Sequence, residues 1–515
     1  ECFGLSWAQQ LKNKDIPEGG SKAVCLVTPQ PGEDRTFLMH NCVKRMADAM
    51  LDLIVPSTRD TIVTRTVDAD DVPLGDELIF LGPDENITPT DLDWIVARAA
   101  ARGYTMPSAF MSSKPRAGIN HKEYGVTSEG VAVFLGEALR AIGIKPTEEP
   151  WTIKLTGGPD GDVAGNMLKI LHRDYGQMVR VVGLADGTAC AEDPEGIPME
   201  ELLRLFEGSL PLADLKASML SGQGKLTLAD TPAGVAARNT MHNRVVADAF
   251  VPAGGRPATM NASNCEDFLL SDGKTPSARV IVEGANLFLT PEARLSLFEK
   301  AGLPIVKDSS ANKCGVICSS MEIRASMCVS DEEFVALKTE YVEQVLGLLR
   351  QMAQLEAKQL FAEAARDVTT PLPALSERIS FAILRVSDAL STLMDSYAQD
   401  KQLWPLVSAQ LPPALATSAH APKLPERLPW EYQKSVIVKS LASRLVYREG
   451  LSFIEAMPDA RLPSFSLAYL EEEQRVARLA DAVAASGHSY APEVEALLLQ
   501  GGVRVAAEKA AGTMR

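Results

Sequence analysis

The chain has 515 residues, 46% of them apolar, which is ordinary for a globular protein with buried cores. Its 67 acidic and 51 basic residues give a net charge of -16, which argues against nucleic acid or anionic membrane as the main partner. No apolar run reaches the roughly 18 residues of a membrane span, no signal peptide is recognisable, and the eight cysteines show neither a disulfide framework nor metal-ligand spacing. We expect a cytoplasmic or mitochondrial-matrix protein that binds small metabolites and no metal.

The chain begins with Glu1 rather than Met, inside a pattern typical of a folded segment, so we expect the natural protein to extend upstream. A glycine-rich turn then delivers Lys22 to the start of a predicted strand, 23–28. Burial lowers the pKa of a lysine, and a lysine held there could act as a base or proton carrier near neutral pH. The alternative interpretation is a solvated lysine in a turn.

Two helices follow, one over 34–54 and one that starts after Thr88 as N-cap and ends before Gly103. Between them lies a short predicted strand, 77–81, which is soon followed by Asp84. Active-site groups of α/β folds collect beyond the carboxyl ends of strands, which makes Asp84 a candidate catalytic residue. The alternative is an aspartate that bonds its own backbone in a turn.

A polar, glycine-punctuated stretch, 114–130, opens a helix that runs to about Ile142. Thr127 and Ser128 lie at its start, and N-capping is the structural explanation for both. The short linker 146–150 then predicts a domain boundary near residue 150.

Residues 151–186 have the pattern of a βαβ unit: an apolar strand, a glycine-rich turn over 156–161, a helix closed by Gly176, and a second apolar strand. The turn brings backbone N–H groups to a helix N-terminus, where they favour a bound phosphate. Asp186 stands 25 residues after Gly161, close to the spacing at which an acidic residue meets an adenosine ribose. Pro159 replaces the first glycine of the usual fingerprint, and a purely structural turn is the alternative.

Three further strands are predicted over 245–251, 278–282 and 305–306, and each ends at small or polar residues. In a doubly wound parallel sheet such ends line one crevice, in which a dinucleotide binds. A helix is predicted to start after Asn312, with Val316 and Ser319 on one face.

The remaining residues have a helical pattern. Ser330 and Glu333 form a predicted capping box ahead of a long amphipathic helix, and further helices are predicted over 376–394 and 432–449. The proline-rich segment 411–429 between them is interpreted as a linker or strap. We see no catalytic constellation here, and the apolar stripes indicate core or subunit packing.

Six motifs occur in the order seen in glutamate dehydrogenases: the turn before Lys22, the residues around Asp84, and the segments 118–131, 157–166, 282–286 and 315–319. The likeness is strong over 1–330. Three segments, 12–22, 120–131 and 155–166, resemble most closely the large, long-chain NAD-specific class, and segment 441–450 resembles the C-terminal region of that class.

The resemblance implies an α/β fold in three parts: a substrate domain with a mixed sheet over 1–150, truncated at its N-terminus; a Rossmann-like, doubly wound NAD-binding domain over 151–330; and a helical C-terminal region over 331–515. It implies NAD-dependent deamination of L-glutamate to 2-oxoglutarate and ammonium, and the reverse reaction. NAD is expected rather than NADP because Asp186 would repel a 2′-phosphate. The resemblance and the apolar stripes together predict a homo-oligomer.

Carried over residue by residue, the resemblance makes Lys22 the catalytic lysine and Asp84 the proton shuttle. Three residues are implied around the substrate: Thr127, Val316 and Ser319, the last at the distal carboxylate. The implied cofactor-binding residues are Gly158, Gly161, Asp162, Val163, Asp186, Ala253 and Asn286, of which the last two lie near the nicotinamide.

Two alternatives stay open. One is a dehydrogenase of another amino acid, as in the related leucine and phenylalanine enzymes, although the hydroxyl of Ser319 suits a carboxylate better than an apolar side chain. The other is a non-catalytic dinucleotide-binding or regulatory module. The chain also departs from the family: a basic residue that holds the substrate carboxylate would lie further upstream than this sequence reaches, and Gln10 stands where another lysine is expected.

Overall fold

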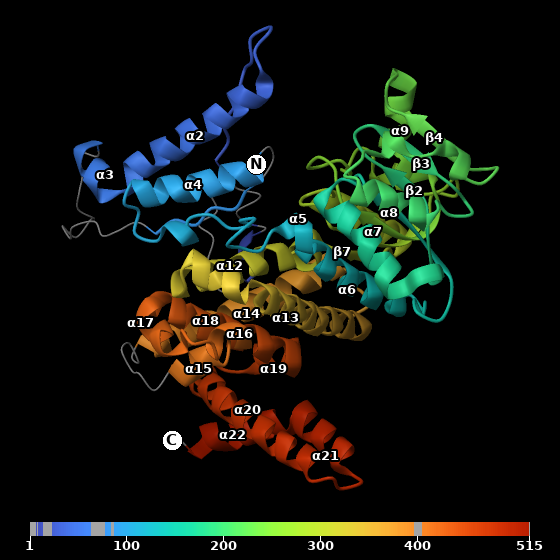
Figure 1. Cartoon of the computed structure of the whole chain (residues 1–515). Coiled ribbons are helices and arrows are strands. Elements are labelled where there is room, and N and C mark those ends of the chain that lie inside the picture. The colour runs from blue at the N-terminus through green and yellow to red at the C-terminus, as the bar shows by residue number, and fades with distance from the viewer. Residues whose placement is uncertain are drawn as a thin grey trace. The chain divides into compact units, whose positions relative to one another are not determined.

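The structure is a computed structural model that describes residues 7, 9–13, 23–62, 78–83, 87–395 and 404–513 (Figure 1). The chain divides into two compact units. Unit 1 comprises Glu1–Ala8, Glu18–Ala353 and Leu411–Pro429, and unit 2 comprises Gln9–Pro17, Gln354–Gln410 and Trp430–Arg515. None of the described helices is both long and apolar enough to cross a membrane.

The described residues before 150 are mainly helical. The elements are α2 (Arg35–Ile54), α3 (Pro56–Ile62), α4 (Pro89–Ala101), η1 (Pro107–Ala109), α5 (His121–Tyr124) and α6 (Val126–Ala141). Asp34 caps α2, and Thr88 and Asp91 form a capping box on α4, so both predicted helix starts are confirmed. Gly125, at φ 63°, divides the single helix expected up to Ile142 into α5 and α6.

The strand predicted over 23–28 is wrong. Residues 23–30 have no regular secondary structure and are largely exposed. A strand needs a partner for its backbone N–H and C=O groups, and no described strand lies beside this segment. The strand predicted to end at Leu81 is a single parallel bridge from Leu81 to Met111, so the described residues of 1–150 contain no sheet.

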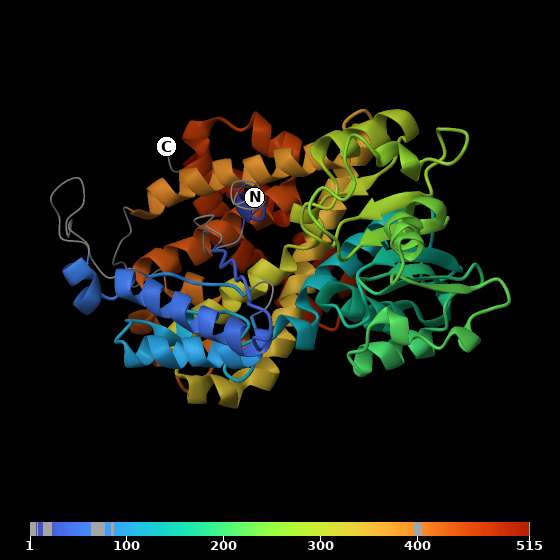
Figure 2. The same cartoon turned by 90° about the horizontal axis from the view of Figure 1, so that it is seen from above.

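Unit 1 contains a seven-stranded sheet in the order β4-β3-β2-β1-β5-β6-β7. The green arrows in Figure 2 show strands of this sheet from above. Its strands are β1 (Trp151–Thr156), β2 (Val179–Ala185), β3 (Ala189–Glu192), β4 (Lys225–Leu228), β5 (Ala247–Pro252), β6 (Ala278–Val282) and β7 (Ile305–Val306). Strands β2, β1, β5, β6 and β7 are parallel, and β3 and β4 are antiparallel additions at one edge. The predicted α/β fold class is confirmed, with the switch in winding direction between β1 and β5.

Helices connect and cover these strands. They are α7 (Asp162–Tyr175), α8 (Met199–Glu207), α9 (Pro232–Arg244) and α10 (Pro291–Ala301), with the short turns η2 (Gly176–Met178), η3 (Leu212–Asp214), η4 (Ala217–Met219) and η5 (Cys265–Phe268). After β7 come α11 (Asp308–Ala311) and α12 (Cys314–Cys328). Helix α12 is buried along most of its length and packs against α6 and η1.

The long helix α13 (Asp331–Arg366) runs from unit 1 into unit 2. Its predicted capping box is confirmed, because Ser330 N donates to Glu333 Oε2 at 2.8 Å and Glu333 N donates to Ser330 Oγ at 3.2 Å. The proline-rich segment 411–429 belongs to unit 1 and forms short helical turns, α16 (Pro413–Ala416), η7 (Ala421–Lys423) and α17 (Leu424–Arg427), rather than an extended strap.

Unit 2 is helical throughout its described secondary structure. It contains α14 (Leu372–Asp395), α15 (Trp404–Ser408), α18 (Trp430–Glu449), α19 (Leu451–Ala456), η8 (Asp459–Arg461), α20 (Leu462–Ala485), α21 (Ala491–Leu497), the π-helical turn η9 (Leu498–Gly502) and α22 (Val503–Thr513). The predicted end of α18 at Gly450 is confirmed, with φ 88° at that glycine.

Candidate active site

The carboxyl ends of β1, β5 and β6 meet at the switch point of the sheet. Ala253 N donates to Thr156 O at 2.9 Å, and Gly284 N donates to Pro252 O at 3.0 Å. A Cβ added to Gly157 would lie 2.9 Å from Gly254 N, so only glycine allows the two loops to approach this closely. The loops after these three strands therefore pack backbone against backbone, at the position where doubly wound sheets bind their ligands.

Gly157→Ala tests this close approach. Gly157 has φ 105°, and its new Cβ would also press on Ala164 Cβ at 2.9 Å. Gly143, with φ 87° and nothing within 4 Å, is the matched control for backbone strain alone. We expect Gly157→Ala to lower the free energy of unfolding by about 1–3 kcal/mol more than Gly143→Ala, because crowding adds to strain. Equal losses in denaturant unfolding would contradict the crowding.

The glycine turn leads into the N-terminus of α7. Gly161 is the N-cap residue and no side chain caps the helix, so the first N–H groups of α7 are available to a ligand. Gly165 is the glycine that lets turn and helix pack, since a Cβ there would lie 2.1 Å from Pro159 O.

Asp186 lies beside this turn, as its spacing predicts. A Cβ on Gly158 would lie 3.0 Å from Asp186 Oδ2. The carboxylate already accepts four hydrogen bonds, from Thr188 N and Oγ1 (both 2.7 Å), Ala189 N (2.9 Å) and Leu212 N (2.7 Å). Asp186 therefore organises the connection from β2 to β3, and its contact with a ribose stays a prediction.

Val163 lies directly after the glycine turn and links it to α6. Ser128 Oγ, on α6, donates to Val163 O at 2.9 Å, and a Cβ on Gly284 would lie 3.1 Å from Val163 Cγ1. Asn166 Nδ2 donates to Lys122 O at 2.8 Å and to Asp162 O at 2.9 Å. Burial raises the pKa of Asp162. The predicted N-cap roles of Thr127 and Ser128 are wrong, because Gly125 is the N-cap residue of α6 and no side chain caps this helix. Ser128 instead joins α6 to the start of α7.

Asn286 has a partner that the sequence analysis missed. Asn312 Nδ2 donates to Asn286 Oδ1 at 2.8 Å and to Gly284 O at 3.1 Å. Asn312 is only 5% exposed, and its Oδ1 accepts no hydrogen bond from the described residues. A buried amide with an unused acceptor suits an N–H donor from a bound molecule. The available signal was an asparagine directly before the predicted start of a helix.

The three predicted substrate residues lie on α6 and α12, two helices that pack against each other. Val316 and Ser319 are partly exposed positions of α12, whereas most of that helix is buried. A Cβ on Gly315 would lie 2.7 Å from Thr127 Oγ1, which sets Thr127 against the same stretch of α12. His121 Nε2 lies 3.4 Å from Ser319 Oγ. His121 belongs to the motif 118–131 that resembles glutamate dehydrogenases, and its sequence position predicted no role of its own.

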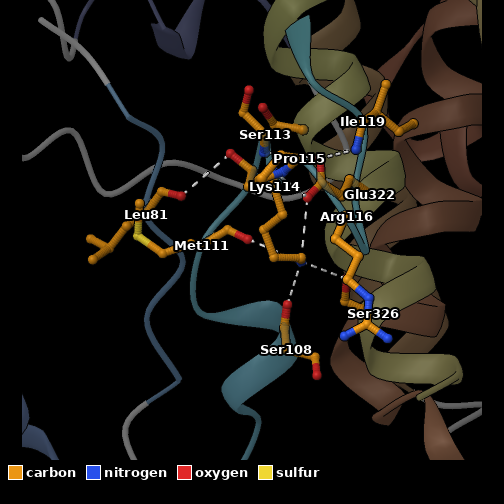
Figure 3. A network of polar contacts seen from close by, with 12 residues as sticks. Leu81, Ser108, Met111, Ser113, Lys114, Pro115, Arg116, Ile119, Glu322 and Ser326 are labelled. Carbon is orange, nitrogen blue, oxygen red and sulfur yellow. Dashed lines mark hydrogen bonds and ion pairs between the residues drawn. The ribbon is translucent and has the colours of Figure 1, made fainter. Parts of the chain in front are cut away.

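A buried polar network fixes the loop that leads to His121 (Figure 3). Glu322, on α12, accepts from the backbone N–H groups of Ser113 (2.9 Å), Ile119 (2.9 Å) and Lys114 (3.3 Å). Lys114 Nζ lies 3.3 Å from Glu322 Oε1 and donates to Met111 O at 3.1 Å. Both charged side chains are at most 2% exposed, and burial raises the pKa of Glu322.

Comparison with known proteins follows this geometry. Residues 117–369 match the model of the Glutamate/Leucine/Phenylalanine/Valine dehydrogenase family, and residues 1–227 match the model "Bacterial NAD-glutamate dehydrogenase, catalytic domain". The chain is 31% identical to the probable NAD-specific glutamate dehydrogenase of Schizosaccharomyces pombe and 33% identical to the NAD-specific glutamate dehydrogenase of Neurospora crassa. The chain belongs to the glutamate dehydrogenase family.

These alignments cover 88% of this chain and 41% and 44% of the two relatives, so the chain spans less than half their length. Among solved structures, a hetero-hexameric glutamate dehydrogenase from Thermus thermophilus shares 20% identity, with a TM-score of 0.47, over 72% of this chain and 74% of that one.

The two residues that family resemblance makes catalytic, Lys22 and Asp84, lie outside the described residues. The described segment that precedes Asp84 in sequence is 78–83, in which the Leu81 carbonyl accepts from Ser112 N at 2.9 Å. Among the described residues, no group of three or more His, Cys, Asp or Glu side chains is placed to hold a metal ion.

Proposed function

We propose that the chain carries the catalytic core of an NAD-dependent glutamate dehydrogenase, which converts L-glutamate to 2-oxoglutarate and ammonium and catalyses the reverse reductive amination. The observation that carries this proposal is the link between the two halves of the site. Through Ser128 and Val163, one helix, α6, joins the glycine-rich turn of the sheet to the stretch of α12 that lies against Thr127 and carries Ser319. A dinucleotide and a small dicarboxylate could therefore meet at α6.

The uncapped N-terminus of α7 suits the pyrophosphate of an NAD molecule. Gly158, Gly161, Asp162 and Val163 would hold the pyrophosphate at the N-terminus of α7. Ala253 and Asn286 would lie near the nicotinamide, where Asn312 Oδ1 could accept from a carboxamide. Asp186 would disfavour the 2′-phosphate of NADP. When bound, NAD supplies the acceptor for the hydride that leaves carbon 2 of glutamate.

Proton transfers fall to Lys22 and Asp84. Lys22 would polarise the 2-oxo group or activate the water that attacks the imine, and Asp84 would exchange a proton with the departing ammonia. A pair of this kind is needed because the carbinolamine must gain and lose protons within one enclosed site. Ser319 would donate to the distal carboxylate, with Thr127 and Val316 beside it.

The biological setting is part of the proposal. The partners are L-glutamate, 2-oxoglutarate and ammonium, and the strongly acidic composition makes nucleic acid and membrane poor partners. The apolar stripes of the helices suit a homo-oligomer, and a cytoplasmic or mitochondrial-matrix location suits the chemistry. A dehydrogenase of another amino acid and a non-catalytic nucleotide-binding module are the competing functions.

The test is the formation of reduced nicotinamide from NAD and L-glutamate, with L-leucine and L-phenylalanine as competing substrates. This chain and a version extended upstream are each assayed, together with Lys22→Ala and with Lys145→Ala, whose side chain is 71% exposed, as the matched control. Glutamate-specific activity that Lys22→Ala abolishes and Lys145→Ala retains supports the proposal. Turnover of leucine alone, or NAD binding without turnover in either length of protein, would overturn it.

A further inference from the structure

The side chain of His121 lies among the predicted substrate residues. Its Nε2 is 3.4 Å from Ser319 Oγ, and a Cβ on Gly315 would lie 3.9 Å from its Nδ1. The same glycine borders Thr127 Oγ1. The imidazole is therefore in contact with the stretch of α12 that carries Val316 and Ser319, and it is itself partly accessible.

The backbone of His121 is held in place from three directions. Its own N–H donates to Ser113 Oγ at 3.3 Å, and Asn120 caps the short helix α5 by accepting from Glu123 N at 3.0 Å. The preceding loop is fixed by Glu322, which accepts from Ser113 N and Ile119 N (Figure 3). A ring attached to so constrained a backbone presents its nitrogen to Ser319 in a defined geometry.

The imidazole is neutral at pH 7, because burial lowers the pKa of His121 to about 4. A neutral imidazole has one N–H donor and one acceptor nitrogen. If Nε2 accepted from Ser319, the only proton of the serine hydroxyl would be used up. If Nε2 carries the hydrogen and donates it to Ser319 Oγ, the hydroxyl proton remains available to a ligand.

A carboxylate is an acceptor only, so it requires the second arrangement. We propose that His121 is a positioning residue that donates from Nε2 to Ser319 Oγ and thereby directs the serine hydroxyl toward the distal carboxylate of a five-carbon dicarboxylate. The identity of that ligand rests on the proposed function. The inference goes further by assigning dicarboxylate selectivity to a pair, His121 and Ser319, rather than to the serine alone.

Binding of glutarate, a five-carbon dicarboxylate without an amino group, tests the pair without requiring turnover. Calorimetric titration is done on the full chain with His121→Leu, His121→Gln, Ser319→Ala and the double variant His121→Leu/Ser319→Ala. Loss of the neutral hydrogen bond from His121 should weaken glutarate binding about five- to tenfold in His121→Leu, and loss of the donor to the charged carboxylate should weaken it at least as much in Ser319→Ala. Glutamine retains an N–H donor and should stay within about threefold of wild type.

The decisive comparison is the double variant. If His121 acts through Ser319, removing both side chains should weaken glutarate binding no more than removing the Ser319 hydroxyl alone. Losses that multiply in the double variant would overturn the inference, as would a His121→Leu protein that binds glutarate like wild type. His172→Leu, at an exposed histidine of the same unit, is the control, and thermal unfolding of each variant verifies folding.

Activity separates this inference from the proposed function. A wild-type protein that binds glutarate without oxidising L-glutamate contradicts the proposed function, and the variant comparison still decides the role of His121. A wild-type protein that fails to bind glutarate overturns the inference whatever its activity. Where L-glutamate is oxidised, His121→Leu should raise the KM for L-glutamate about five- to tenfold and leave the KM for NAD unchanged.

Discussion

Replacing Glu322 with alanine is expected to lower the free energy of unfolding by about 3–5 kcal/mol, because it leaves a buried cation without its partner. The ammonium of Lys114 would keep only neutral acceptors, and the backbone N–H groups of Ser113 and Ile119 would lose theirs. No water can readily replace the carboxylate, since Glu322 is fully buried and Lys114 is 2% exposed. Denaturant unfolding at pH 7 measures the loss.

Two comparisons isolate the ion pair. Glu343→Ala, at an exposed glutamate of α13, controls for the removal of a carboxylate and should change stability by less than about 0.5 kcal/mol. The double variant Glu322→Gln/Lys114→Met removes both charges and should cost less than Glu322→Ala. A loss below about 1 kcal/mol for Glu322→Ala would show that other contacts hold the loop.

Local signals made most of the sheet predictable. The strand over 278–282 matches β6, the strand over 305–306 matches β7, and both stand out as short apolar runs that end in polar residues. The capping pairs at Thr88 and Ser330 were equally readable, because a cap depends on residues three positions apart. The strand over 23–28 failed for the opposite reason, since pairing depends on a distant segment that the pattern does not contain.

The candidate site divides in the same way. The closeness of Gly158 and Asp186 followed from a spacing along one βαβ unit. The roles of His121, Asn312 and Glu322 could not be predicted, because their partners are 198, 26 and more than 200 residues away in sequence. Pattern alone also gave no account of Lys154 inside an apolar strand.

Lys154 shows why tertiary partners decide such cases. It is fully buried in β1, and its Nζ donates to the carbonyls of His242 and Val245 at 2.6 Å and to Ser277 Oγ at 2.7 Å. Burial lowers its pKa well below the usual value. Two segments that are far from β1 in sequence, the C-terminal end of α9 and Ser277, thus supply the acceptors that make a lysine tolerable in the sheet.

Glu129 is a second buried carboxylate with partners from distant helices. It lies on α6 and accepts two hydrogen bonds from Arg173 on α7, at 2.6 and 3.0 Å, and two from Arg350 on α13, at 2.8 and 2.7 Å. Its side chain is 5% exposed, whereas those of the two arginines are 44% and 41% exposed. One carboxylate therefore holds three helices together through two guanidinium forks.

Glu129→Gln should lower the free energy of unfolding by about 1–3 kcal/mol at pH 7. This range is reduced because solvent reaches both guanidinium groups.

Burial raises the pKa of Glu129, but the hydrogen bonds from Arg350 and Arg173 outweigh it and hold the pKa at about 2, below the ordinary 4.5. Because the pKa is lowered by folding, the stabilisation is complete above pH 4.5 and disappears as the pH falls toward 2. The difference in unfolding free energy between wild type and Glu129→Gln should therefore be constant from pH 7 to about 5 and shrink below pH 4.5. Denaturant unfolding across this range measures it, with Glu148→Gln, whose carboxylate is 66% exposed, as the control. A difference that stays constant down to pH 3 would mean that the glutamine variant perturbs packing rather than charge.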